Sequence, residues 1–209
     1  MSKITFYTNP MSRGQIARWA LHEAGADYEQ VLLEYGSTMK EAAFLAVNPM
    51  GKVPTIVHDG HVVTECAAIC AYLADAFPDA GLAPLAGEHA DYHRWMYFCA
   101  GPVESAITNR RFGWEPDDEQ SRSVGFGSYD AVVNALEAML AGKAYVCGDR
   151  FTAADIYVGS QILWGTQFKT LPDSPAFNDY AARLAARPAY QAAKAIDGDL
   201  IAKAQASVS

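Results

Sequence analysis

The sequence lacks a hydrophobic run of the roughly 18 residues that a membrane-spanning helix needs, and its first ten residues lack the apolar core of a secretory signal. Clustered positive charge is also scarce. The net charge of the 209 residues is −8, and the longest Lys/Arg run is the pair Arg110-Arg111. Because an acidic surface repels phosphate backbones, we expect a cytoplasmic protein that binds neither membranes nor nucleic acid.

Cysteine is present, but not in a metal-binding or redox arrangement. The four cysteines are Cys66, Cys70, Cys99 and Cys147, with no CxxC pair and no His/Cys spacing typical of zinc. Cys66 and Cys70 lie four residues apart in a predicted helix, where cysteine usually behaves as a small hydrophobic residue. We therefore expect four reduced thiols and no metal.

The first 78 residues alternate between short strands and helices. Alternating character and turn signals predict four strands, at 3–7, 28–33, 53–58 and 61–64. Asp59-Gly60, between the last two strands, is a strong hairpin signal. Apolar residues at helical spacing predict one helix that Gly25 closes, a short one over 38–46, and one over 65–77 that Pro78 stops. The order β-α-β-α-β-β-α indicates an α/β domain.

The rest of the chain shows helical patterns and no convincing strand. The stretch 78–87 is rich in Pro and Gly, as is typical of a linker. Long helices are predicted over 88–111, with a kink at Gly101-Pro102, and up to Leu140. We therefore expect an α/β domain at 1–79 and an all-α domain at 88–209, joined by a linker at 80–87.

Two further helix starts are specified within the all-α part. Thr152 and Asp155 have the spacing of a capping box, in which each residue satisfies a backbone N–H of the other. Ser174-Pro175 has the N-cap and first-turn residues that open a helix. Shorter helices are expected to fill the remainder.

Three segments together resemble the cytosolic glutathione S-transferases of bacteria. They are Asn48–Pro54 (NPMGKVP), Thr64-Glu65-Cys66, and Gly148–Asp155 (GDRFTAAD), and they span most of the chain in the family's order. The resemblance implies a thioredoxin-like N-terminal domain, an all-helical C-terminal domain and glutathione as co-substrate. It also implies a homodimeric detoxification enzyme that conjugates the glutathione thiolate to small hydrophobic electrophiles.

The resemblance assigns residues to the glutathione peptide. It implies that the Val53-Pro54 bond is cis, which turns the Val53 backbone outward to pair with the cysteinyl backbone of glutathione. Glu65 supplies the anion for the γ-glutamyl ammonium, and the Cys66 N–H at a helix start meets the γ-glutamyl carboxylate. Cys66 stands where the family usually has Ser, and a thiol is the weaker hydrogen-bond partner.

Three cations are further candidates for contacts with glutathione. Lys52 and Lys40 could meet the glycyl carboxylate, as basic residues at similar positions do in relatives, and Arg13 could contact glutathione or its sulfur. Either lysine could equally be a solvated surface side chain.

Catalysis requires glutathione as its thiolate, so a donor to sulfur is expected after the first strand. Cysteine-type relatives have a Cys there, and this chain has none. Tyrosine-type relatives have their Tyr four residues before an Arg-Gly pair, a position that Asn9 occupies here, so Tyr7 is out of register. Ser12 matches the helix-start hydroxyl of serine-type relatives to within about one residue, although it is also a reasonable N-cap. Ser12 is therefore the favoured thiolate stabiliser, in a serine-type or atypical site, with Tyr7, Asn9 and Arg13 as alternatives.

Two other functions remain open on the same residues. One is glutathione-dependent peroxide or disulfide reduction, although the missing active-site Cys argues against a glutaredoxin-like mechanism. The other is a non-catalytic glutathione-binding interaction module. Cys66 in place of the usual Ser, and the open assignment of the hydroxyl that stabilises the thiolate, give this alternative some support. Retention on immobilised glutathione without turnover of any electrophile would identify such a module.

Overall fold

The computed structural model describes residues 3–206. Packing divides them into two compact units: unit 1 consists of 3–83 together with 187–206, and unit 2 of 84–186. The C-terminal residues of the described chain therefore pack with its N-terminal part. The division into domains 1–79 and 88–209, with a linker at 80–87, stays a prediction from the sequence.

Unit 1 is built on a four-stranded mixed sheet. Its strands are β1 (Ile4–Thr8), β2 (Tyr28–Leu32), β3 (Thr55–His58) and β4 (His61–Val63). They lie in the order β2-β1-β3-β4, with β1 parallel to β2 and the other neighbours antiparallel. Asp59 and Gly60 have φ angles of 52° and 78°, as a tight hairpin turn requires. The predicted strands and hairpin are thus confirmed.

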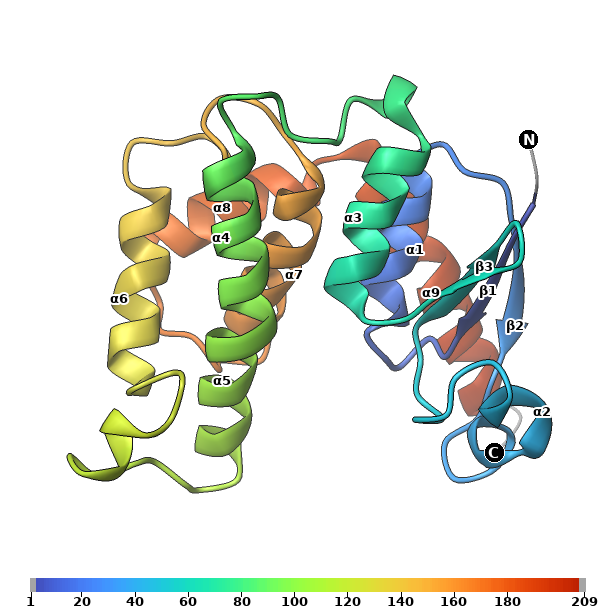
Figure 1. Ribbon diagram of the computed structural model, residues 1–209, viewed down its shortest axis with the longest axis horizontal. Coiled ribbons are helices and arrows are strands. Elements are labelled where there is room, and N and C mark those ends of the chain that lie inside the picture. Colours follow the sequence, from blue (N-terminus) through green and yellow to red (C-terminus); the bar gives the residue numbers. More distant parts are fainter. Residues whose placement is uncertain (1–2, 207–209) are drawn as a thin grey trace. The chain divides into compact units, whose positions relative to one another are not determined.

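Helices surround this sheet within unit 1. They are α1 (Gly14–Glu23), the 3-10 turn η1 (Thr38–Lys40), α2 (Ala42–Leu45), α3 (Cys66–Ala76), the 3-10 turn η2 (Pro78–Ala80) and α9 (Pro188–Ala206). Figure 1 shows α1 and α3 side by side along the sheet, and Ile4 and Phe6 of β1 are fully buried. The order β-α-β-α-β-β-α is confirmed. The short helix expected over 38–46 is two pieces, because Glu41 has an extended backbone.

A second, smaller cluster lies on the other side of β1. Tyr7, which alternates with Phe6 along the strand, packs with the buried residues Leu33, Met39 and Phe44. The rings of Tyr7 and Phe44 are 5.3 Å apart. This cluster holds the segment around α2 against the sheet.

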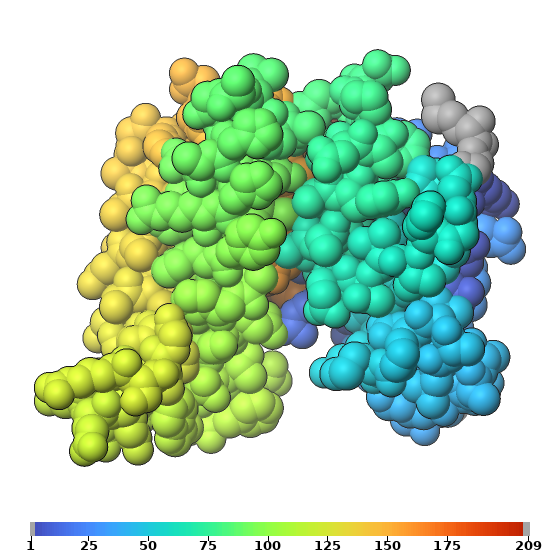
Figure 2. All heavy atoms as spheres, in the orientation of Figure 1, coloured from blue at the N-terminus to red at the C-terminus, as the bar shows by residue number. Residues whose placement is uncertain are grey.

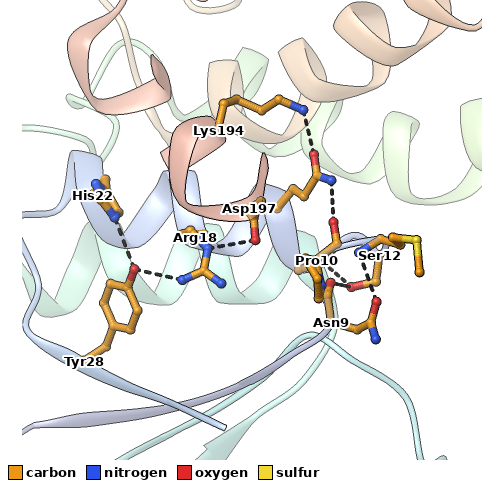
Figure 3. Close-up of polar contacts among 11 residues, drawn as sticks. Asn9, Pro10, Ser12, Arg18, His22, Tyr28, Lys194 and Asp197 are labelled. Carbon is orange, nitrogen blue, oxygen red and sulfur yellow. Dashed lines mark hydrogen bonds and ion pairs between the residues drawn. The ribbon is translucent and has the colours of Figure 1, made fainter. Parts of the chain in front are cut away.

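The last helix, α9, differs from the expectation of shorter helices. It has 19 residues and packs along α1. Its apolar pattern is weak, because only Ala193 and Asp197 are buried, so hydrophobic periodicity could not reveal its extent. Polar contacts attach it instead: Arg18 and Asp197, both almost fully buried, form an ion pair of 3.0 Å (Figure 3). Arg18 also donates to the Tyr28 hydroxyl at 3.0 Å.

Unit 2 is helical. Its helices are α4 (His89–Phe98), the π-helical turn η3 (Cys99–Val103), α5 (Glu104–Arg111), the 3-10 turn η4 (Gln120–Arg122), α6 (Tyr129–Leu140), α7 (Ala153–Gln167) and α8 (Pro175–Ala185). No strand forms within 84–186. The expected kink at Gly101-Pro102 is the π-helical turn, because Pro102 cannot donate to the helical ladder. Figure 2 shows the segment 113–125, in yellow-green, projecting at one end of this unit. No helix within 3–206 combines the length and apolar character that crossing a membrane demands.

A buried carboxylate organises the centre of unit 2. Asp155 is fully buried, and it completes the predicted capping box with Thr152 at the start of α7. Its Oδ2 accepts from the Thr152 N–H at 2.8 Å, and its Oδ1 accepts from the Val146 N–H at 2.8 Å and the Tyr180 hydroxyl at 2.7 Å. One side chain therefore joins α7 to the preceding loop and to α8.

We predict that Asp155→Ala lowers the free energy of unfolding by about 3–5 kcal/mol, because buried donors on Val146, Thr152 and Tyr180 lose their acceptor. Asp149→Asn is the control, since Asp149 is exposed, and it should change stability by less than about 0.5 kcal/mol. Urea denaturation of both variants measures the difference. Equal stability of the two variants would contradict the role given to Asp155.

Candidate functional site

The turn between β1 and α1 is fixed by the buried side chain of Asn9. Its Nδ2 donates to the Leu33 carbonyl at 2.8 Å, and its Oδ1 accepts from the Met11 N–H at 2.9 Å. Its backbone carbonyl accepts from the Ser12 N–H at 3.1 Å. Asn9 is therefore a structural support of the turn, because its side chain holds both the next strand and the following residues.

Ser12 lies in this turn, two residues before the first residue of α1. Its hydroxyl donates to the Asn9 carbonyl at 2.6 Å and accepts from the Gly14 N–H at 2.9 Å (Figure 3). The cap residue of α1 is Arg13, which makes no side-chain capping bond. The Ser12 hydroxyl thus accepts from an N–H at the start of α1, although Ser12 lies one residue before the cap residue Arg13. Its own proton points to the Asn9 carbonyl.

Gly14 closes the turn at a point where backbone and side chains crowd. A Cβ at this position would lie 2.0 Å from Thr8 Oγ1 and 3.0 Å from Ser12 Oγ. Both oxygens can approach the helix start only because glycine has no side chain. Thr8 itself is fully buried.

The start of α3 is joined to the same turn. Glu65 precedes the helix with φ of 60° and ψ of 118°, a backbone conformation that non-glycine residues rarely adopt. Its side chain is exposed. Cys66, the first residue of α3, is buried, and its thiol donates to the Arg13 carbonyl at 3.6 Å. The structure therefore brings Cys66 together with the Ser12–Arg13 turn.

None of the four cysteines forms a disulfide within residues 3–206. The Cys66 side chain interacts with Cys70 one turn later in α3. This hydrogen bond, together with burial, raises the pKa of the Cys70 thiol well above its usual range. Burial raises the pKa of Cys147 to about 11. Neither thiol is therefore a reactive thiolate at neutral pH.

The loop that leads into β3 has its own internal support. Asn48 Nδ2 donates to the Lys52 carbonyl at 2.8 Å, and its Oδ1 accepts from the Met50 N–H at 3.1 Å. Lys40 Nζ donates to the carbonyls of Met50 and Gly51, each at 3.0 Å. Lys40 is thus part of the support of this loop, while the Lys52 side chain is exposed.

The Val53-Pro54 bond at the end of this loop is cis, as the family resemblance implied. Val53 is half-buried and packs against the cluster of Leu33, Met39 and Phe44. Tyr7 packs against the same cluster.

The structural roles of Asn9 and Asn48 were not predicted from the sequence. Both begin the tripeptide Asn-Pro-Met, and in both the side-chain Oδ1 accepts from the methionine N–H two residues later. This is the Asx-turn pattern that Asn favours. The repeated tripeptide was the signal that could have identified the two turns.

Comparison with known proteins gives a consistent result. Residues 2–75 match the family model for the glutathione S-transferase N-terminal domain, and residues 92–188 match that for the C-terminal domain. A glutathione S-transferase from Hyoscyamus muticus is 31% identical, with 83% of this chain and 88% of that protein covered.

Solved structures show the same similarity. A glutathione transferase from Methylococcus capsulatus strain Bath is 32% identical with a TM-score of 0.75, covering 93% of this chain and 98% of that one. A sphingomonad glutathione S-transferase in complex with glutathione is 31% identical with a TM-score of 0.74, over 93% and 98% of the two chains. The predicted thioredoxin-like sheet domain with an all-helical partner is confirmed.

We predict that Gly14→Ala lowers the free energy of unfolding by about 1–3 kcal/mol, because the new methyl group overlaps Thr8 Oγ1. In an ordinary helix position the same change would stabilise by about 0.5–1 kcal/mol. Adding Thr8→Ala should recover part of the loss, whereas adding Thr8→Ser, which keeps the hydroxyl, should not. Thermal unfolding of these three variants and the wild type measures the changes, and a stabilised Gly14→Ala would show that the turn is less crowded than described.

Proposed function

Because the chain belongs to the glutathione S-transferase family, we propose that it conjugates the thiolate of glutathione to small hydrophobic electrophiles. The observation that carries this proposal is the junction of two elements in unit 1. The turn with Ser12 and the start of α3 with Glu65 and Cys66 are linked by the bond from Cys66 Sγ to the Arg13 carbonyl. A hydroxyl, an anion and a helix N-terminus are thereby available to one small peptide ligand.

Glutathione is held by its peptide ends in this proposal. Val53 pairs its backbone with the cysteinyl backbone, a mode of recognition that does not depend on side chains. Glu65 accepts from the γ-glutamyl ammonium, and the N–H of Cys66 at the N-terminus of α3 meets the neighbouring carboxylate. The rare backbone conformation of Glu65 supports this role, since strained residues cluster at ligand sites.

Cations complete the proposed glutathione site. Lys52 is exposed and carries three N–H donors, and it is our first candidate for the glycyl carboxylate. Lys40 is the second, because its two bonds to the loop carbonyls leave one ammonium N–H for a ligand. Arg13 belongs to the turn itself and adds positive charge beside the expected sulfur.

Ser12 is the proposed thiolate stabiliser. Its hydroxyl proton now contacts the Asn9 carbonyl, so it must turn to the sulfur when glutathione binds. A hydrogen bond to an ion contributes about 1.5–3 kcal/mol, against about 0.5–1.5 kcal/mol for a neutral pair, so the exchange is favourable. Asn9 keeps a donor, because its carbonyl still accepts from the Ser12 N–H. Lowering a thiol pKa by two units takes about 2.7 kcal/mol, which this bond and a helix N-terminus can supply.

From the same family membership we propose that the conjugation detoxifies electrophiles. We further propose that it takes place in the cytoplasm and requires no metal. Measuring glutathione affinity by calorimetry together with the conjugation rate on a generic aryl halide tests the function. Tight glutathione binding with peroxide reduction but no conjugation would favour the hypothesis of a peroxidase. Glutathione binding without any turnover would favour an interaction module.

We also predict a homodimer, in which the N-terminal domain of one chain pairs with the C-terminal domain of the other. Sedimentation equilibrium at micromolar concentration should give twice the chain mass of 22.6 kDa. A single species at the chain mass would exclude the dimer.

We predict that Glu65→Gln weakens glutathione binding by about 1.5–3 kcal/mol, because a neutral amide cannot replace a charge-assisted acceptor. The fold should persist, since Gln and Glu place the same demand on the backbone. Asp75→Asn neutralises an exposed carboxylate on α3 and should bind glutathione as the wild-type protein does. Cys66→Ser should bind equally well or better, because it restores the hydroxyl usual in the family. Calorimetry decides, and unchanged affinity in Glu65→Gln would mean that the assigned orientation of glutathione is wrong.

We predict that Ser12→Ala shifts the pH profile of kcat upward by about one to two pH units, the size of one hydrogen bond to an anion. Glutathione affinity should change little, because Val53 and Glu65 hold the peptide. Ser12→Thr, which keeps a hydroxyl, should retain most of the activity, and Tyr7→Phe should leave the profile in place. If Tyr7→Phe shifted the profile while Ser12→Ala did not, the enzyme would be of the tyrosine type.

A further inference from the structure

The turn that contains Ser12 is supported by a side chain from the last helix. Lys194 of α9 donates through its Nζ to Gln15 Oε1 at 2.8 Å, and Gln15 Nε2 donates to the Pro10 carbonyl at 2.5 Å. Figure 3 shows these contacts leading from Lys194 to Pro10 and the neighbouring Ser12. Lys194 follows Gln15 by 179 residues in the sequence. The proposed binding of glutathione uses neither side chain.

The helix that carries Lys194 is fixed against α1 on both sides of this residue. Both helices belong to unit 1 and pack along each other. Arg187, directly before α9, binds both carboxylate oxygens of Glu23, at 2.6 and 2.7 Å. Asp197 pairs with Arg18 at 3.0 Å. Lys194 lies between these two attachments, so its backbone is held at a defined place beside the start of α1.

The Pro10 carbonyl belongs to the central peptide of a β-turn. The Ser12 N–H donates to the Asn9 carbonyl at 3.1 Å, which closes the turn over residues 9–12. The central peptide consists of the Pro10 carbonyl and the Met11 N–H. Gln15 Nε2 holds this carbonyl, and Asn9 Oδ1 holds this N–H. Side chains therefore fix both polar groups of the central peptide.

The orientation of the central peptide defines the type of turn. Types I and II differ by a rotation of this peptide of roughly 180°, and type II requires a positive φ at the third residue. Met11, the third residue here, is not among the residues of 3–206 with a positive φ, so the turn is not of type II. A rotated peptide would lose both side-chain bonds and change the direction in which the chain reaches Ser12. The bond from Gln15 therefore contributes to the position of the Ser12 hydroxyl.

Lys194 determines which end of the Gln15 amide meets Pro10. A side-chain amide carries a donor nitrogen and an acceptor oxygen, whereas an ammonium group can only donate. The Lys194 ammonium therefore binds Oε1 and leaves Nε2 for the Pro10 carbonyl. Without the ammonium, a half-turn of the amide would place two acceptors against each other. Both side chains are half-buried, so water competes for these bonds less than it does at an exposed site.

We infer that Lys194 and Gln15 are positioning residues, which hold the turn so that the Ser12 hydroxyl reaches the sulfur of bound glutathione. This inference rests on the proposed role of Ser12 and extends it to the last helix. Lys194 acts on Gln15, Gln15 acts on the Pro10 peptide, and neither side chain contacts glutathione. Loss of either one should weaken the bond to the thiolate and leave the sites for the peptide ends of glutathione intact.

Titration of the thiolate absorbance of bound glutathione tests the inference. Lys194→Met removes the ammonium group, and Gln15→Met removes the amide but keeps the ammonium. We expect each variant to raise the pKa of the bound thiol by about half a unit to one unit, less than Ser12→Ala does. Glutathione affinity, measured at a pH where the bound thiol is protonated, should change little. Lys203→Met is the matched control, because Lys203 is an exposed lysine of the same helix, and it should titrate as wild type does.

A double variant separates positioning from a direct effect of the Lys194 charge on the sulfur. If Lys194 acts through Ser12, adding Lys194→Met to Ser12→Ala should raise the pKa of the bound thiol no further. The inference is overturned if the two shifts add in full, if Lys194→Met or Gln15→Met titrates as wild type does, or if Lys203→Met shifts the pKa as much as Lys194→Met.

Amide hydrogen exchange without glutathione distinguishes a failure of this inference from a failure of the proposed function. The N–H groups of Met11 and Ser12 should exchange at least about threefold faster in Lys194→Met than in the wild type, because the turn opens more often. If the thiol bound to the wild-type protein titrates as free glutathione does, the proposed function is wrong. In that case faster exchange in Lys194→Met still supports the positioning of the turn, and unchanged exchange overturns it.

Discussion

The candidate site depends on the hydrogen bonds of one buried side chain, Asn9. A buried amide needs hydrogen-bond partners for its nitrogen and its oxygen, and here the Leu33 carbonyl and the Met11 N–H supply them. These bonds bend the chain between β1 and α1 and place the Asn9 carbonyl where Ser12 donates to it. The position of the Ser12 hydroxyl is therefore a consequence of satisfying Asn9. Gly14 allows the turn to close, because a side chain there would meet Thr8.

Buried polar groups also decide how distant parts of the chain pack. Within unit 1, the ion pair of Arg18 with Asp197 attaches the last helix to α1 across 179 residues of sequence. Within unit 2, Asp155 joins two helices and a loop. Breaking either network would leave buried donors without acceptors, which costs more than an exposed pair contributes. Specific polar contacts thus complement hydrophobic burial in both units.

The sequence predicted features that depend on local chemistry. Asp59-Gly60 identified the hairpin because its turn needs positive φ at both residues, and Thr152 with Asp155 identified the start of α7 because the two residues cap each other. The length of α9 was not predictable, because its buried face contains Ala193 and Asp197 rather than an apolar stripe. The pocket lined by α5, α6 and the α7–α8 loop was not predictable either, because these segments meet only in the folded chain. The roles of Ser12 and Glu65 stay predictions.

We propose that the turn built on Asn9 presents a hydroxyl that keeps bound glutathione ionised. Titrating the thiolate absorbance of glutathione bound to the wild-type protein measures this directly. We predict that the pKa of the bound thiol lies about one to two units below the free value near 8.5. A bound thiol that titrates as free glutathione does would contradict it.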